Sequence, residues 1–533
     1  MPESQGTHLT EKSWPTLTAQ YTGLLIAVVT FICVRRRYFS PLSCTPGPFL
    51  ASFSRLWHLR QIWNGDQNLA LIRAHDEYGH FVRLAHDEVS VSHPDGIRRV
   101  LLTTLPKGNW YRISSLPDYT HKAPFSMVDP REAKEAKKYL LTGYLQHNVL
   151  QSEPAMDESI KKLLAWMDKH ADNQKPMDLD KFFTYTAFDI MGEVIFSQPF
   201  GFLEKGEDIH RAIAMVWGAE AYVTFIGYFQ WIHRVFANPF TTWLGILPMG
   251  HMYDVTMAAL RAREENADAR RRSDLAAHWF RGLERARKDG SGVFDLRCLR
   301  AFASSNVVAA SETVSAGLQS FVYHLSRQPT GCGRGWQRIR NEIDAARRDG
   351  GRCQGAVVSY EDAAELPYLQ AAVKEGLRMF GPASMGLPRV APRGGVTIGD
   401  TTFPEGVILS ISPWVIHYSK EFWGPDAREF NPDRWFGPDI ASREKYFIPA
   451  SYHYCPSCGL QPHRDASMMH WGAGYASCPG QNVAKIQLLK IAATIVRDYD
   501  ICQVEPEKEW KWAAHFTAIP YDWPVFIRKR EGE

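Results

Sequence analysis

A single cysteine in a glycine-rich loop is the residue of this chain best placed for chemistry. The loop runs Trp471-Gly-Ala-Gly-Tyr-Ala-Ser-Cys478-Pro-Gly480 and leads into residues 481–499, whose apolar side chains recur with helical period. Pro479 suits a first helical turn, where a missing N–H costs nothing. Free N–H groups and the helix dipole at this end both favour a thiolate, the form that binds metal. The loop therefore predicts a metal-ligating thiolate, and a buried structural cysteine is the alternative.

An acid and an alcohol lie next to each other in the middle of a second predicted helix. Residues 299–325 are mostly small and apolar, with Glu312 and Thr313 at their centre. Burial of an unpaired acid is costly, so the presence of Glu312 in this apolar helix requires an explanation. A structural explanation for Thr313 is a hydrogen bond to the carbonyl one turn back.

A third motif pairs an acid with a base. Glu375 and Arg378 are three residues apart in the predicted helix 360–380, so they share one helix face. Such pairs are usually surface ion pairs, but the neighbours here are apolar. The segment 430–435, FNPDRW, supplies Arg434 as a third charged residue.

These stretches, in this order, resemble the motifs of the cytochrome P450 monooxygenases. The cysteine loop is similar to the family's haem-binding loop, usually written F-x-x-G-x-R-x-C-x-G. Trp471 stands for the Phe, Gly474 and Gly480 stand for the glycines, and Cys478 stands for the cysteine that ligates the haem iron. The usual Arg, a haem-propionate partner, is Ala476 here.

The resemblance assigns roles to the other motifs. It implies that Glu312 and Thr313 deliver protons during oxygen cleavage, and that Ala310 replaces the usual Gly of the oxygen-binding groove. It implies that Arg389 binds a haem propionate. The helix after Asp129 would offer basic residues to a propionate and to a reductase, the candidates being Lys134, Lys137 and especially Lys138.

The resemblance also implies a structural network and a pocket. Glu375, Arg378 and Arg434 would form a buried network on the cysteine side of the haem. The pocket would be lined from three segments, through Trp110, Phe125 and Met127, through Met385 to Leu387, and through Phe516 to Ile519. Plain core packing is the alternative for Trp110, Phe125 and Met127.

Composition excludes some classes of protein. The 533 residues carry a net charge of +3 and no basic stripe, which argues against nucleic-acid binding. Nine scattered cysteines, an odd number, argue against a disulfide framework and favour a reducing compartment.

The N-terminal part predicts a membrane anchor. Residues 1–15 form a short tail, and residues 16–34 form one apolar run about 28 Å long as a helix, close to the thickness of a bilayer core. Three arginines follow at once and predict that the rest of the chain lies on the cytoplasmic side. A cleaved signal peptide is the rival, but its charges should precede the apolar run. Residues 35–54 then predict a basic, Pro-rich hinge before a catalytic domain at 55–533.

One passage does not fit the family pattern. Residues 451–470 are longer than the family's linker, and they contain Cys455, Cys458, His463 and His470. Two thiols plus imidazoles could bind zinc, although a zinc site usually brings a second regular ligand pair. An irregular insertion or a translated intron is the alternative, and residues 331–335 resemble a smaller insertion.

Together these features predict a mainly α fold with small β-sheets (α+β), a single haem-binding domain behind an N-terminal transmembrane helix. The motifs are most similar to those of fungal members of the family, such as relatives of pisatin demethylase. The resemblance implies a monooxygenase of secondary metabolism that oxidises a lipophilic small molecule. It implies haem b, O2 and electrons from NADPH through a reductase, with cytochrome b5 as a second donor, in a monomer at the endoplasmic reticulum membrane. A haem-thiolate isomerase or dehydratase, and a degenerate non-catalytic relative, are the alternatives.

Overall fold

The computed structural model describes residues 13–244, 250–265, 273–327, 334–438, 440–447 and 474–530. Trp471 and the whole 451–470 segment, with its zinc alternative, lie outside these residues.

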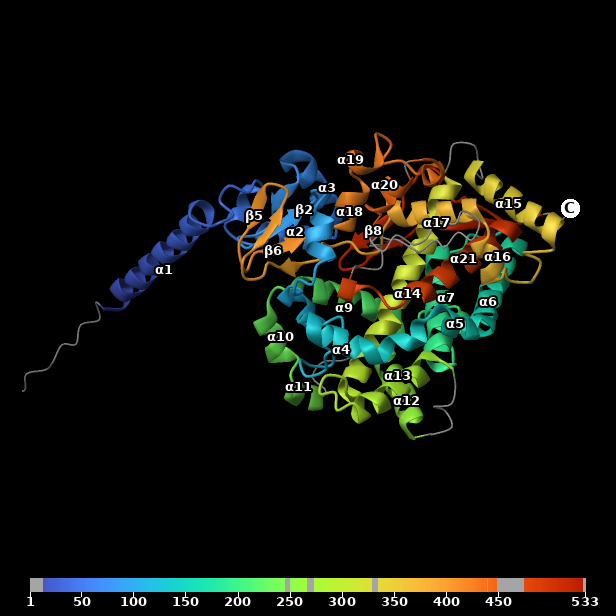
Figure 1. The fold of residues 1–533 in the computed structure, drawn as a ribbon, viewed down its shortest axis with the longest axis horizontal. Helices are drawn as coiled ribbons and strands as arrows, with labels where there is room; N and C mark the ends of the chain where they lie inside the picture. Colours follow the sequence, from blue (N-terminus) through green and yellow to red (C-terminus); the bar gives the residue numbers. More distant parts are fainter. Residues whose placement is uncertain are drawn as a thin grey trace, which may run out of the picture.

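The N-terminal helix α1 (Ser13–Tyr38) extends away from the rest of the molecule (Figure 1). Its segment Thr18–Tyr38 has a mean hydropathy of 1.5 and is not buried by protein. The arginines expected in the hinge form the last turn of α1 instead. Arg36 Nη1 donates to the Phe53 carbonyl at 2.9 Å, and Arg83 Nη2 donates to the Arg36 carbonyl at 2.9 Å. The joint is therefore hydrogen-bonded to the body.

Helices make up most of the body. They are α2 (Leu56–Asn64), α3 (Gln67–Tyr78), α4 (Pro130–Leu140), α5 (Gln146–Val149), α6 (Glu153–Asp172), α7 (Leu179–Phe196), α8 (Phe202–Lys205), α9 (Ala212–Ile226), α10 (Gln230–Phe236), α11 (Pro239–Trp243), α12 (His251–Glu265), α13 (Leu275–Lys288), α14 (Leu296–Ser326), α15 (Arg334–Gly350), α16 (Tyr360–Ala364), α17 (Pro367–Met379), α18 (Pro413–His417), α19 (Lys420–Trp423), α20 (Ile440–Glu444) and α21 (Gln481–Asp498).

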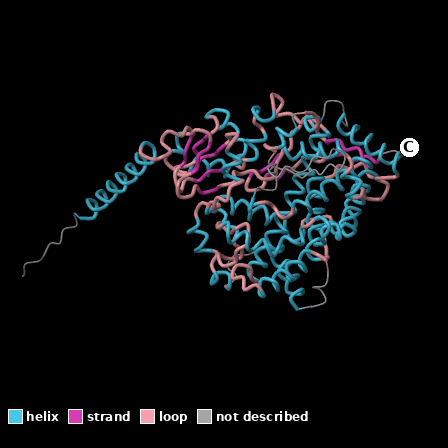
Figure 2. Tube along the Cα trace, viewed as in Figure 1, coloured by secondary structure: helices cyan, strands magenta, loops and turns pink. Residues whose placement is uncertain are grey.

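The strands are short and form small sheets. They are β1 (Phe81–Arg83), β2 (Glu88–Val91), β3 (Arg389–Val390), β4 (Val396–Ile398), β5 (Thr401–Phe403), β6 (Ile408–Ser410), β7 (Tyr499–Gln503), β8 (Lys511–Ala514), β9 (Ala518–Tyr521) and β10 (Val525–Lys529). One sheet has the order β1-β2-β6-β3, and the pairs β4-β5, β7-β10 and β8-β9 stand apart. Figure 2 shows the four-stranded sheet beside the end of α1 and further strands near the C-terminus, with helices between. The predicted α+β class is confirmed, and residues 80–92, which alternate apolar and polar, contain the paired strands β1 and β2.

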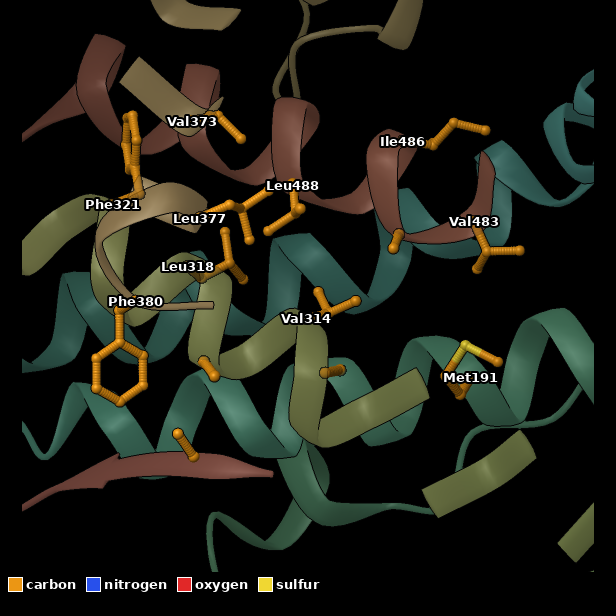
Figure 3. Packing of buried hydrophobic residues seen from close by; sticks show 14 of the residues in the cluster. Met191, Val314, Leu318, Phe321, Val373, Leu377, Phe380, Val483, Ile486 and Leu488 are labelled. Carbon is orange, nitrogen blue, oxygen red and sulfur yellow. The ribbon is translucent and has the colours of Figure 1, made fainter. Parts of the chain in front are cut away.

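The centre of the molecule is the long helix α14, which packs against α7, α17 and α21. Asp295 caps α14 by accepting the Cys298 N–H at 2.8 Å. Leu318 and Leu377 point toward Leu488 in the shared core (Figure 3). A Cβ on Gly317 would lie 3.1 Å from both Leu377 and Leu488, so a glycine allows the three helices to approach closely. This packing fixes α21, and with it the cysteine loop, against α14.

Candidate active site

The cysteine loop leads directly into α21. A short 3-10 turn (Gly474–Ala476) precedes Cys478, and Gly480 is the N-cap residue of the helix. The Gly480 N–H and the Lys137 ammonium both lower the pKa of the Cys478 thiol, but its burial outweighs them and raises the pKa above 9.0. The start of the helix therefore lowers the pKa of Cys478 as expected, but by less than burial raises it. A bound metal ion would itself deprotonate the thiol.

Lys137 joins α4 to this loop. Its Nζ donates to the carbonyls of Tyr475, at 2.8 Å, and Ser477, at 2.5 Å. Lys138, the residue favoured from the sequence, lies 3.4 Å from Asp289 and is 58% exposed. Adjacent residues of a helix point about 100° apart, so only one of the two lysines can face the loop. The structure assigns the contact with the cysteine loop to Lys137.

The loop and α14 are also connected through a tyrosine. Asn482 Nδ2, in the first turn of α21, donates to the Tyr144 carbonyl at 2.8 Å. The Tyr144 hydroxyl donates to Asn306 Oδ1 on α14 at 2.7 Å. These bonds hold the start of α21 in register with the middle of α14.

The middle of α14 carries the acid and the alcohol expected from the sequence. Thr313 donates its hydroxyl to the Ala309 carbonyl at 2.8 Å, as in the structural alternative. Ala309 is exposed, and Ala310 and Thr313 are half-buried, so protein does not fully cover this face of α14. Glu312 is 2% exposed, and neither of its carboxyl oxygens accepts a hydrogen bond from an N–H or hydroxyl of the described residues.

Glu375, Arg378 and Arg434 lie together in a fully buried network. Glu375 accepts from Arg378 at 2.8 and 2.9 Å and from Arg434 at 2.8 Å. Glu375 also accepts hydrogen bonds from Trp435 Nε1 at 3.0 Å and from the Asn431 N–H at 2.9 Å. Both arginines also donate to backbone carbonyls, Arg378 to those of His417 and Ala427 and Arg434 to that of Asp426. The network therefore fixes the end of α18 and the segment after it to α17.

Two buried cations meet near the loop, and neither contacts a carboxylate of the described residues. Lys107 and Arg389 are paired in an antiparallel bridge and are 5% and 2% exposed. Lys107 Nζ donates to two carbonyls, and burial together with Arg389 and Lys137 holds its pKa well below 10.5. Arg389 Nε has no hydrogen-bond partner within the described residues.

The two buried cations show whether the residues of this chain fit a haem. Buried cations need a compensating anion. The carboxylates of haem propionates would supply this anion beside Arg389. Lys107 adds a second positive charge, which Ala476 cannot provide. The residues present therefore fit the group, with Cys478 as its thiolate ligand.

The expected lining residues form an aromatic cluster. Trp110 stacks on Phe516 with ring centroids 5.6 Å apart, Phe125 contacts Phe516 edge-on, and Met385 packs with them. A separate cavity of about 800 Å³ lies between residues 112–132 and α10. Of Trp110, Phe125 and Met127, only Met127 lines that cavity.

Three residues of this region were not predicted in these roles. Lys107 carries no local motif, because its partner Arg389 is remote in the chain. Lys137 was named only as one candidate of three. Glu220 on α9, described below, did have a signal, since it is the only charged residue of an otherwise apolar helix, AIAMVWGAEAYVTFI.

Comparison with known proteins agrees with this geometry. The family model for cytochrome P450 matches residues 46–518. A cytochrome P450 monooxygenase of Aspergillus terreus is 28% identical over 90% of this chain and 94% of its own length. The cytochrome P450 monooxygenase asR2 of Sarocladium schorii is 30% identical, covering 91% of this chain and 93% of its own.

A solved structure supports the fold. A crystal structure of a cytochrome P450 superposes with a TM-score of 0.67 at 19% identity, covering 87% of this chain and 94% of that one. The chain thus combines a cysteine loop before α21, an acid and an alcohol in the helix that α21 packs on, and a family match over most of its length. It belongs to the cytochrome P450 family and is a monooxygenase of the fungal type.

Proposed function

We propose that this chain is a haem b monooxygenase that oxidises a lipophilic small molecule in fungal secondary metabolism, with electrons from NADPH through a reductase. The observation that carries the proposal is the placement of Cys478 at the start of α21, which packs on the helix bearing Glu312 and Thr313. Haem with a thiolate ligand supplies the activation of O2 from which one oxygen atom enters the substrate and the other leaves as water.

The chain's own residues have distinct tasks in this proposal. Cys478 ligates the iron, and Arg389 and Lys107 hold the propionates. Glu312 keeps a proton at its carboxyl group because its surroundings disfavour the charge. Thr313, one residue further along α14, presents a hydroxyl on the uncovered face of the helix. The aromatic cluster of Trp110, Phe125 and Phe516 supplies the apolar surface for a lipophilic substrate.

We also propose the cellular setting. Residues 16–34 cross the endoplasmic reticulum membrane once, and residues 35–54 join this anchor to the cytoplasmic catalytic domain at 55–533. Support comes from the unburied apolar helix and from the arginines at its end. The reductase, with cytochrome b5 as a second donor, would dock on the side of the cysteine loop, where α4 presents Lys134 and Lys138. The catalytic unit would be a monomer.

A reconstitution without substrate tests the electron donor. Full-length protein in membranes is mixed with a fungal NADPH–cytochrome P450 reductase under carbon monoxide, and reduction is followed by the Soret band. Reduction with NADPH and reductase, and none with NADPH alone, supports the proposal. Reduction equally fast without the reductase contradicts it.

A further inference from the structure

A second acid, half-buried, lies against Glu312. Glu220, on α9, accepts the Thr517 N–H at 3.2 Å and the Thr517 hydroxyl at 2.9 Å. Its carboxyl group is also within hydrogen-bonding reach of the Glu312 carboxyl on α14. Residues far apart in the sequence, from α9, α14 and the turn before β9, therefore meet in one cluster.

Two carboxyl groups this close cannot both be ionised at low cost. Glu312 has no N–H or hydroxyl donor of ordinary geometry within the described residues, so a proton shared with Glu220 is what satisfies it. Burial raises the pKa of both acids, and Glu220 raises that of Glu312 further, to well above 4.5. The two donors of Thr517 favour the charge on Glu220 instead. The shared proton therefore belongs to Glu312.

No other charge competes for this pair in the part of the chain that the structure describes. The groups acting on Glu312 are Glu220 and the Trp217 indole, both from α9, and those acting on Glu220 are Glu312 and Thr517. The other helices packed on α14 contribute no titratable group to either carboxyl. No described cation can therefore stabilise the ionised form of Glu312.

We infer that Glu220 is a positioning residue for proton delivery, which orients Glu312 as a neutral acid when α9 is docked through Thr517. This inference rests on the proposed role of Glu312. The proton donor is then held in place by three elements, α9, α14 and the β8–β9 hairpin. Proton delivery then depends on the hydrogen bonds that hold α9 to Thr517.

The experiment uses the detergent-solubilised, haem-loaded full chain and the infrared carbonyl stretch of protonated carboxyl groups as a function of pH. The Glu312→Gln variant assigns the band of Glu312. In Glu220→Gln, which removes the neighbouring charge, the midpoint of that band should move down by about one pH unit or more, a tenfold change in acid dissociation. Glu220→Asp, which keeps the charge, should remain near the wild type, as should Glu204→Gln, a matched loss of a surface carboxylate.

A second readout follows the reaction. In Glu220→Gln, peroxide released per NADPH consumed should rise at neutral pH and return toward the wild-type value about one pH unit lower. A Glu312 midpoint that is the same in Glu220→Gln and the wild type overturns the inference about Glu220 alone. If Glu312→Gln removes no protonated carboxyl band at neutral pH, the proposed role of Glu312 fails as well. Should Glu220→Gln not fold, Thr517→Val, which takes one donor from Glu220, must change the Glu312 midpoint, and an unchanged midpoint overturns the inference.

Discussion

Lys107 and Arg389 lie side by side in an antiparallel backbone bridge, both buried, and neither contacts a carboxylate of the described residues. Two buried cations in this position predict an anion. The propionates of haem are the anion that the family supplies, and the two cations bring the positive charge that Ala476 cannot.

Lys107→Met should therefore have opposite effects on the haem-free and haem-loaded protein. Without haem, removal of a buried ammonium that contacts no carboxylate of the described residues should raise the melting temperature. With haem, loss of a charge-assisted hydrogen bond worth about 1.5–3 kcal/mol should weaken haem retention about tenfold or more. Calorimetry and haem transfer to apomyoglobin measure the two effects.

Arg98→Met, at an exposed ion pair, is the control and should change neither quantity. Haem retention equal to the wild type in Lys107→Met would show that Lys107 does not face a propionate.

The Glu375 network should dominate stability on the cysteine side. Glu375→Gln leaves Arg378 and Arg434 with no carboxylate at the centre of the network, and an uncompensated buried charge costs about 3–5 kcal/mol. Denaturant titration of the full chain measures the loss. Asp433→Asn is the control, because its ion pair with Arg338 is more than half exposed and should contribute about 0–1 kcal/mol. Equal losses for the two variants would contradict the buried network.

Stability should fall in mild acid because of a buried histidine. His75 bonds the Gly79 carbonyl and the Ser90 hydroxyl at 2.8 Å each, and burial lowers its pKa from 6.5 to about 4. The unfolded chain therefore binds the proton first, so stability is lost as pH falls from about 6.5 to about 4, by roughly 3 kcal/mol for this group.

In His75→Gln, the free energy of unfolding should depend less on pH across that window. An unchanged slope in His75→Gln would mean that His75 does not titrate in this way.

Removal of residues 1–34 should release the protein from membranes without unfolding it. The truncation keeps Arg36 and its bonds to Phe53 and Arg83, so the body retains the joint. Carbonate extraction followed by a melting curve tests both points. A truncated chain that stays in the carbonate-resistant pellet would show that the anchor lies elsewhere.

The sequence predicted those features whose signal is local. The loop around Cys478 and the Glu375–Arg378 spacing lie within single helices or turns. Lys107 and Arg389 are brought together by a bridge between remote segments, which no local pattern shows. The choice between Lys137 and Lys138 depends on the rotation of α4, and one residue of error turns a side chain by about 100°. Glu220 had a local signal as the lone charge of α9, but its partner could be found only in the fold.

We predict that Cys478 ligates haem in this chain although Ala476 replaces the usual Arg. The most direct test is a reduced carbon-monoxide difference spectrum of membranes that contain the full chain, beside a Cys478→Ala control. We expect a strongly red-shifted Soret band in the wild type that is absent from the control. A folded wild-type protein with no haem signal, or with the same band in Cys478→Ala, would contradict it.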